Sequence, residues 1–234
     1  MRNLELTFIS DTHGHHQDIE LPGGDILIHS GDFMQYSRDP KCAEEFLDWF
    51  NQQNYSSCIL VAGNHERFVQ ISHDEFRGML TAYKYVDYLQ DEAIEIQFNI
   101  DGETTDIKIY GSPWQPWFKN WAFNLPRGGK DLYQTWQMIP EDVDILVTHT
   151  PPATILDAMM LPYPNYNLGC ELLLERVYQI KPKIHAFGHI HGSYGYRFYD
   201  GTHFINASQL NDNYRLVNSP INAKWDPVKN ELFF

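Results

Sequence analysis

The most informative stretch of this sequence is Ile184-His185-Ala186-Phe187-Gly188-His189-Ile190-His191, an apolar run that stops at Gly-His-x-His. Short apolar runs bounded by glycine and polar residues are typical of strands that are covered on both faces of a sheet. In open sheets of that kind, ligands bind beyond the carboxyl ends of the strands. The two histidines stand at such an end, although one histidine there is more often a hydrogen-bonded structural residue.

Four earlier apolar runs end in a similar way. They are 7–10 before Asp11-Thr12-His13, 26–30 before Gly31-Asp32, 59–62 before Gly63-Asn64-His65-Glu66, and 145–148 before His149. Because ligand sites form where the carboxyl ends of neighbouring strands meet, we expect these clusters in one place. A single cluster is weak evidence, but five in turn favour one shared site over five structural histidines or carboxylates.

Length and charge limit the possible classes of protein. At 234 residues the chain can bury one substantial core, and no linker, repeat or low-complexity tract divides it, so we expect a single domain over residues 1–234. The net charge of −14 disfavours binding to long nucleic acids and to anionic membranes, so the expected partner is small. The sequence carries no indication of an oligomeric state.

The cysteines and the beginning of the chain bear on the cellular compartment. Cys42, Cys58 and Cys170 are too few and too scattered for a disulfide framework or a thiolate metal site. The residues after Met1 lack a signal-peptide core, and no segment approaches the length of a membrane span. A cytoplasmic location is therefore expected.

Hydrophobic patterning and turn residues predict an α/β protein. The expected strands are 4–10, 25–30, 58–62, 93–99, 105–110, 144–148, 183–187, 193–199 and 202–206. The expected helices are 41–53, 73–83, 130–138 and 170–180. Strict alternation of strand and helix fails in the middle and at the end, where hairpin-like pairs occur. This favours one mixed sheet, or two packed mixed β-sheets flanked by helices.

The residue types at the strand ends point to metal ions. Carboxylate, imidazole and amide ligands without a thiolate suit divalent manganese, iron, nickel, cobalt or zinc. The candidate ligands are Asp11, His13, Asp32, Asn64, His149, His189 and His191. These seven are too many for one such ion but fit two, with Asp32 shared. Paired ions attract phosphate despite the acidic chain and are suited to in-line phosphoryl displacement.

These blocks, in this order from Asp11 to His191, resemble the motif set of the calcineurin-like metallophosphoesterases. The resemblance implies that family's four-layer sandwich of two mixed β-sheets flanked by helices. It also implies one ion held by Asp11, His13, Asp32 and His191, and a second held by Asp32, Asn64, His149 and His189. By the same resemblance His65 binds no metal, but stabilises or protonates the leaving oxygen.

Two local features discriminate among branches of that superfamily. Gln35 and Tyr36 stand where serine/threonine phosphatases have Asp and Arg, and Gln35 also replaces the metal-binding Tyr of purple acid phosphatases. The segment 111–124 resembles the branch that contains the mammalian metallophosphoesterase-domain-containing proteins. That branch is associated with phosphodiester hydrolysis, including hydrolysis of cyclic nucleotides.

The sequence therefore predicts a hydrolase, a binuclear metal-dependent phosphodiesterase. Its expected substrate is a small phosphodiester such as a cyclic nucleotide, attacked by a metal-bridging hydroxide, with His65, Asp32 and Asn64 as candidate catalytic residues. Manganese is the expected ion, with iron, nickel, cobalt and zinc as alternatives. Two other functions stay open: a phosphomonoesterase or nucleotidase on the same centre, and a non-catalytic nucleotide- or protein-binding module.

An aromatic segment from Trp114 to Phe123 also has two interpretations. Its rings are Trp114, Trp117, Phe118, Trp121 and Phe123. They could form a wall on which a nucleobase stacks, since aromatic faces accept any base. They could equally form a small core beneath a long loop.

Overall fold

The computed structural model describes residues 2–159 and 166–234, and two six-stranded mixed β-sheets face each other at its centre. In spatial order the first sheet consists of β16 (Glu231–Phe233), β15 (Ile221–Asp226), β1 (Leu4–Ile9), β2 (Gly24–Ser30), β3 (Tyr55–Val61) and β4 (Val86–Tyr88). The second consists of β13 (Gly195–Tyr199), β14 (Thr202–Asn206), β12 (Ile184–Phe187), β9 (Ile145–Thr148), β6 (Glu103–Ser112) and β5 (Glu92–Ile100).

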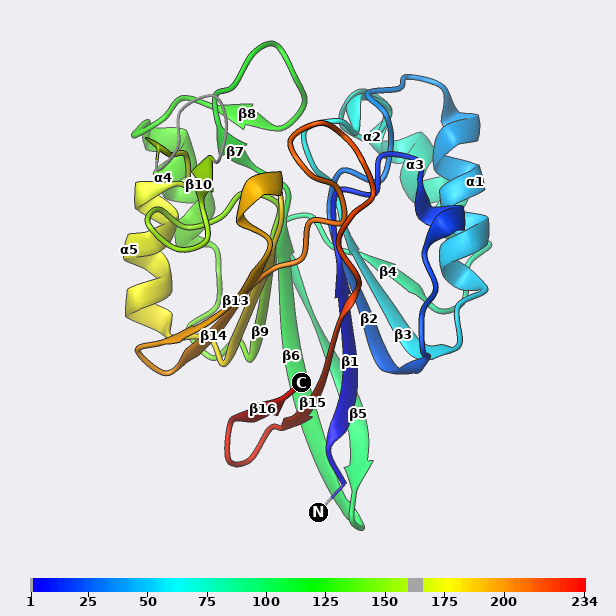
Figure 1. The fold of residues 1–234 in the computed structure, drawn as a ribbon, viewed down its shortest axis with the longest axis vertical. Helices are drawn as coiled ribbons and strands as arrows, with labels where there is room; N and C mark the ends of the chain where they lie inside the picture. The colour runs from blue at the N-terminus through cyan, green and yellow to red at the C-terminus, as the bar shows by residue number, and fades with distance from the viewer. Residues whose placement is uncertain (1, 160–165) are drawn as a thin grey trace.

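Helices cover the outer face of each sheet, which gives four layers (Figure 1). The helices α1 (Pro40–Asn51), α2 (Arg67–Ile71) and α3 (His73–Leu80) lie beside the first sheet, and α4 (Lys130–Gln137) and α5 (Glu171–Ile180) beside the second. Shorter elements are η1 (His16–Asp18), β7 (Gln115–Pro116), β8 (Asn124–Leu125), β10 (Ala158–Met159), β11 (Tyr166–Asn167) and η2 (His191–Ser193). The expected fold, two packed mixed sheets flanked by helices, is confirmed.

Three apolar clusters hold the layers together. Phe8 and Ile28 from the first sheet meet Val147 and Ala186 from the second, and all four are fully or almost fully buried. A second cluster lies between the first sheet and α1, and a third lies between the second sheet and helices α4 and α5. The strands therefore have both faces covered, which explains their nearly continuous apolar runs.

Parallel pairing brings the polar strand ends together. Strands β1, β2 and β3 are mutually parallel neighbours, and so are β6, β9, β12 and β14. Their carboxyl ends lie at the same edge of the two-sheet assembly, at the top of Figure 1. In the described residues, no helix combines the length and apolar character needed to cross a bilayer.

Some elements differ from the sequence-based expectation. The observed boundaries lie within a few residues of the expected ones, but α2, β4, β15 and β16 were not expected. Strand β15 has an alternating burial pattern and pairs antiparallel with β1, at the other end of the chain. Its partner is remote in sequence, so no local turn signal marks the pair.

Candidate metal centre

The structure brings all seven candidate ligands to the carboxyl edge of the sheets. Backbone hydrogen bonds lock the loops that carry them: the amide of His13 donates to the carbonyl of Asp32 at 3.0 Å, and the amide of Gly188 donates to the carbonyl of His149 at 3.1 Å. Neighbouring loops of the same sheet are thus fixed relative to one another. Convergence of the five strand ends follows from the parallel pairing of the strands.

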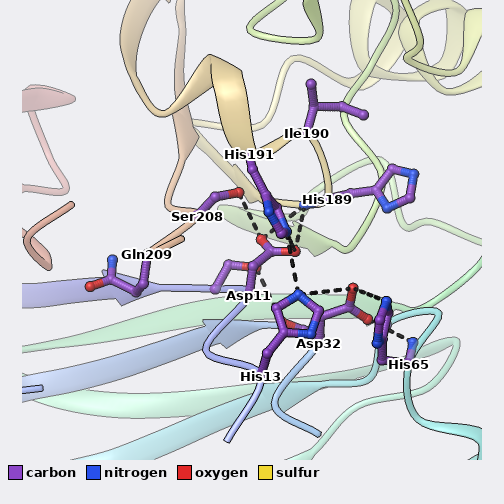
Figure 2. Close-up of polar contacts among 12 residues, drawn as sticks. Asp11, His13, Asp32, His65, His189, Ile190, His191, Ser208 and Gln209 are labelled. Carbon is purple, nitrogen blue, oxygen red and sulfur yellow. Dashed lines mark hydrogen bonds and ion pairs between the residues drawn. The ribbon is translucent and has the colours of Figure 1, made fainter. Parts of the chain in front are cut away.

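One cluster consists of Asp11, His13 and His191, whose ligand atoms all lie within 4.8 Å of one another. The Nε2 atom of His191 is 3.3 Å from Oδ1 of Asp11, and it is also 3.3 Å from Nε2 of His13 (Figure 2). These are three of the four side chains expected around the first ion.

A second cluster consists of Asp32, His149 and His189, again within 4.8 Å. Nε2 of His149 is 3.0 Å from Oδ1 of Asn64 and 3.4 Å from Oδ2 of Asp32. The same Oδ2 atom is 3.8 Å from Nε2 of His13, which belongs to the first cluster. One oxygen of Asp32 therefore lies between the two clusters.

The candidate ligands suit a cation because their hydrogen-bond acceptor atoms face one another. Nδ1 of His13 lies 3.3 Å from the carbonyl of Met34, and Nδ1 of His191 lies 3.0 Å from that of Asn211. A carbonyl only accepts, so each Nδ1 carries a proton, and each ring has a lone pair at Nε2 when that atom is unprotonated. These two Nε2 atoms converge beside the carboxylate of Asp11, an arrangement that a divalent cation satisfies.

Burial sets the protonation states of these histidines. Desolvation lowers the pKa of His13 to about 4 and that of His189 to about 3, so both rings are neutral at neutral pH, the state in which imidazole can bind a metal. His149 is different: burial opposes its charge, but the carboxylate of Asp32 outweighs burial and raises its pKa to about 9. A cation that binds there must displace the proton on His149.

The carboxylate of Asp11 is oriented by groups that the sequence did not single out. The backbone amide of His189 lies 2.9 and 3.1 Å from its two oxygens, and the hydroxyl of Ser208 donates to Oδ2 at 2.7 Å (Figure 2). Burial opposes ionisation of Asp11, but the hydrogen bond and charge of His191 outweigh burial and hold its pKa below the usual range. Ser208 follows β14, a sixth strand end at the same edge, so the strand-end rule applied once more would have found it.

Glu66 joins two of the ligand-bearing loops. Its carboxylate accepts hydrogen bonds from the amides of Asp32 and Met34, both at 2.8 Å, and from that of Gly63. Burial, then the nearby charge of Asp32, raises the pKa of Glu66 to about 8. The sequence placed Glu66 in a motif without giving it a role, and the structure shows that it holds the loops after β2 and β3 together.

Four candidate ligands have left-handed backbone conformations. The φ angles are 52° at Asp11, 41° at His13, 57° at Asp32 and 68° at His189. Residues other than glycine seldom adopt such angles, and those that do concentrate at functional sites. The local strain supports a functional role for this edge.

Gly188 is required by close approach to the ligands, and its substitution should show this. A Cβ at position 188 would overlap Oδ2 of Asp11 and Oγ of Ser10. We expect Gly188→Ala to displace Asp11 and to weaken manganese binding by about 10- to 100-fold, as measured by calorimetric titration. Gly78→Ala is the control, because it meets no atom within 4 Å and lies in α3, where alanine should be neutral or stabilising. Equal affinities in the two variants would contradict the steric argument.

A cavity of about 570 Å³ opens beside the clusters. Trp117, Phe118 and Trp121 line it together with Asp32 and His189. Trp117 is 60% exposed and Phe118 is 41% exposed, so both rings are available to a ligand.

The other two rings of the aromatic segment belong to the core. Phe123 is 1% exposed, and the indole of Trp114 packs between two apolar clusters while its Nε1 donates to Asp91 at 2.6 Å. The segment therefore divides into a cavity wall and a small core, and each interpretation holds for part of it.

His65 lies at the boundary of the centre. Its backbone amide donates to Oδ1 of Asp32 at 2.8 Å, and its Nε2 atom is 3.9 Å from Oδ2 of the same residue. The ring of Trp121 packs edge-on against it, with 4.5 Å between centroids. His65 also forms a group with His13 and Asp32 whose ligand atoms lie within 4.8 Å of one another.

Comparison with known proteins identifies the family. The model of the calcineurin-like phosphoesterase family matches residues 4–193. The chain belongs to the calcineurin-like phosphoesterase family. Its members are metal-dependent phosphoric ester hydrolases, so the expected hydrolase class and metal requirement are in accord with this membership.

Individual proteins that are similar to this calcineurin-like phosphoesterase support the same family membership. Human metallophosphoesterase domain-containing protein 1 is 37% identical over 91% of this chain and 68% of its own length, which confirms the expected branch. Among solved structures, TT1561 of Thermus thermophilus has a TM-score of 0.62 at 12% identity, over 99% of this chain and 98% of its own. Phosphopantetheinyl hydrolase from Mycobacterium tuberculosis has a TM-score of 0.58 at 17% identity, over 88% and 89%. These two structures share the fold.

Proposed function

We propose that this calcineurin-like phosphoesterase is a binuclear phosphodiesterase that hydrolyses a small phosphodiester, such as a cyclic nucleotide. The observation that carries the proposal is Oδ2 of Asp32, which lies 3.8 Å from Nε2 of His13 and 3.4 Å from Nε2 of His149. Asp11 and His191 complete one cluster around it, and the other contains the two remaining proposed ligands, Asn64 and His189. Two divalent cations, manganese or alternatively iron, nickel, cobalt or zinc, would supply Lewis acidity to phosphate and water.

Two side chains are proposed to act on the substrate itself. Nε2 of His65 faces Asp32 at the cavity edge, from where it can give a proton to the departing oxygen. Nδ2 of Asn64 is buried, and within the described part of the chain no group accepts its hydrogen bond. A phosphate oxygen in the cavity would satisfy this donor, as electrostatic stabilisation of the transition state requires.

The surroundings favour a diester over a monoester. Gln35 and Tyr36 are uncharged and stand where serine/threonine phosphatases have Asp and Arg. A phosphomonoester has one more negative charge at neutral pH than a diester, so the missing arginine matters more for a monoester. A monoesterase or nucleotidase on the same centre is the alternative that substrate comparison must decide.

A panel of substrates tests the proposal directly. Manganese-loaded protein should hydrolyse the diester methyl p-nitrophenyl phosphate with a higher kcat/KM than the monoester p-nitrophenyl phosphate. Because the two share a leaving group, the comparison isolates the difference between diester and monoester. The opposite order would favour the monoesterase. Protein that bound nucleotides but hydrolysed neither compound with any of the five metals would be a binding module instead.

His189→Ala should give a protein that holds one ion. His189 belongs to the cluster with Asp32 and His149, and its ring points away from Asp11 in Figure 2. The variant should therefore keep the first ion and lose the second, which elemental analysis of the dialysed protein measures per chain. An unchanged metal count would contradict the assignment of His189 to only one of the two sites.

A further inference from the structure

A second cavity, of about 320 Å³, lies beside the same centre. The first and second cavities share two lining residues, His65 and Tyr214. His13 lines the second cavity, whereas His189 of one candidate cluster and His191 of the other line the first, so both cavities reach the cluster that contains His13 and His191. The proposed proton donor, His65, is thus accessible from both sides.

Rings form the partition between the two cavities. The ring of Tyr214 is 5.0 Å from that of His13 and 6.2 Å from that of His65. On another side, the ring of Tyr36 is 6.0 Å from His65 and 6.1 Å from Trp121. A group attached to phosphorus at the centre can therefore extend into either cavity.

The loops that carry the partition are held in place. The hydroxyl of Tyr36 donates to the carbonyl of Asn120 at 3.1 Å, which ties the loop after β2 to the aromatic segment. The amide of Tyr214 donates to the carbonyl of Asn211 at 2.8 Å, and this carbonyl also accepts from His191. The same backbone group therefore orients a candidate ligand and positions Tyr214.

The two cavities differ in chemistry. The first has the aromatic rings of Trp117, Phe118, Trp121 and Tyr214 and two cationic side chains, Arg127 and Lys119, and the ammonium of Lys119 lies 4.6 Å from the centroid of Trp121. Among the described residues that line the second, none is lysine or arginine, and its polar groups include the imidazole of His15 and the amide of Gln35. Tyr36 adds an aromatic face. Hydrogen-bonding groups beside a ring suit a hydroxylated and uncharged ligand.

We propose that the second cavity is the subsite for one ester group of an acyclic phosphodiester, and that this group is uncharged and hydroxylated, as a sugar is. The first cavity then takes the other ester group, for which the aromatic wall provides a stacking surface. This inference rests on the proposed phosphodiesterase function. Gln35 is a specificity-determining residue in this arrangement, because its amide can bond to the hydroxyl groups of the sugar.

Two substrates and two substitutions test the subsite. Both substrates are p-nitrophenyl phosphodiesters, and the second ester group is either methyl or 5-ribosyl. Gln35→Ala removes the amide, and Gln35→Trp fills the cavity. Gln35 is exposed, so both manganese-loaded variants should fold, and metal content verifies this. Gln17→Ala, at an exposed position outside the lining of both cavities, is the control.

The measured quantity is the ratio of kcat/KM for the ribosyl diester to that for the methyl diester. Gln35→Ala should lower this ratio between about twofold and tenfold, the effect of one hydrogen bond. Gln35→Trp should lower it at least about tenfold, because the larger ester is blocked. If wild type hydrolyses both diesters but neither variant changes the ratio, the subsite assignment is wrong. If wild type hydrolyses no diester, the proposed function fails as well.

Discussion

Asp32→Asn should empty the centre of both cations and lower phosphodiester turnover by at least about a thousandfold. The substitution replaces one oxygen, Oδ2, which lies between the clusters at 3.8 Å from His13 and 3.4 Å from His149. An amide nitrogen at this point carries no negative charge and has no lone pair to offer a cation. Both proposed sites therefore lose a ligand in one step.

The two sites should not be equally sensitive. The cluster with His13 and His191 keeps the carboxylate of Asp11 after the substitution. The other cluster keeps only neutral ligands, His149, His189 and the adjacent Asn64, so its ion should be lost at lower chelator concentration. Folding should persist, because an asparagine at position 32 retains an Oδ1 atom that can accept the amide proton of His65.

The loss of metal from Asp32→Asn can be measured as the number of ions per chain and as the melting temperature. Manganese should raise the melting temperature of the wild type but not that of Asp32→Asn, since a ligand stabilises only the state that binds it. Asp157→Asn is the matched control: Asp157 is 2% exposed and accepts from the amides of Thr154 and Gly169, both at 2.9 Å, outside the centre. Two ions per chain in Asp32→Asn would show that Asp32 does not bridge.

The candidate ligands could be predicted from sequence because each one immediately follows an apolar strand. The strand itself is a local pattern, and parallel pairing then places its carboxyl end with the others. Ser208 follows the strand end of β14, where the same rule applies, but nothing local marks Asn211. Their loop is positioned by contacts with the other end of the chain, such as the 2.8 Å hydrogen bond from the amide of Gln209 to the carbonyl of Ser10.

The aromatic segment could not be resolved from sequence for a related reason. Whether a ring enters a core or lines a cavity depends on the short pairing of β7 with β8, in which Gln115 lies opposite Asn124. That pairing directs Trp114 toward Asp91 and leaves Trp117 exposed. Aromatic composition alone is the same in both cases, so only the folded segment distinguishes them.

His65→Ala should lower turnover by about 100- to 10,000-fold for a diester with an alkoxide leaving group, the usual effect of losing a general acid. Metal content should stay near two ions per chain. The reason is that Asp32 receives the backbone amide of His65, at 2.8 Å, and alanine retains that amide. The substitution removes the ring from the cavity edge while leaving its support of the carboxylate in place.

The dependence on leaving group separates proton donation from metal binding. A p-nitrophenolate leaves without a proton, so His65→Ala should hydrolyse a p-nitrophenyl diester much closer to the wild-type rate than an alkyl diester. Loss of a metal ligand would slow both substrates alike and would lower the metal count. His73→Ala, at the start of α3, controls for loss of a histidine elsewhere. Equal losses of metal and of turnover in His65→Ala would therefore assign the ring to the ligand group with His13 and Asp32, rather than to the departing oxygen.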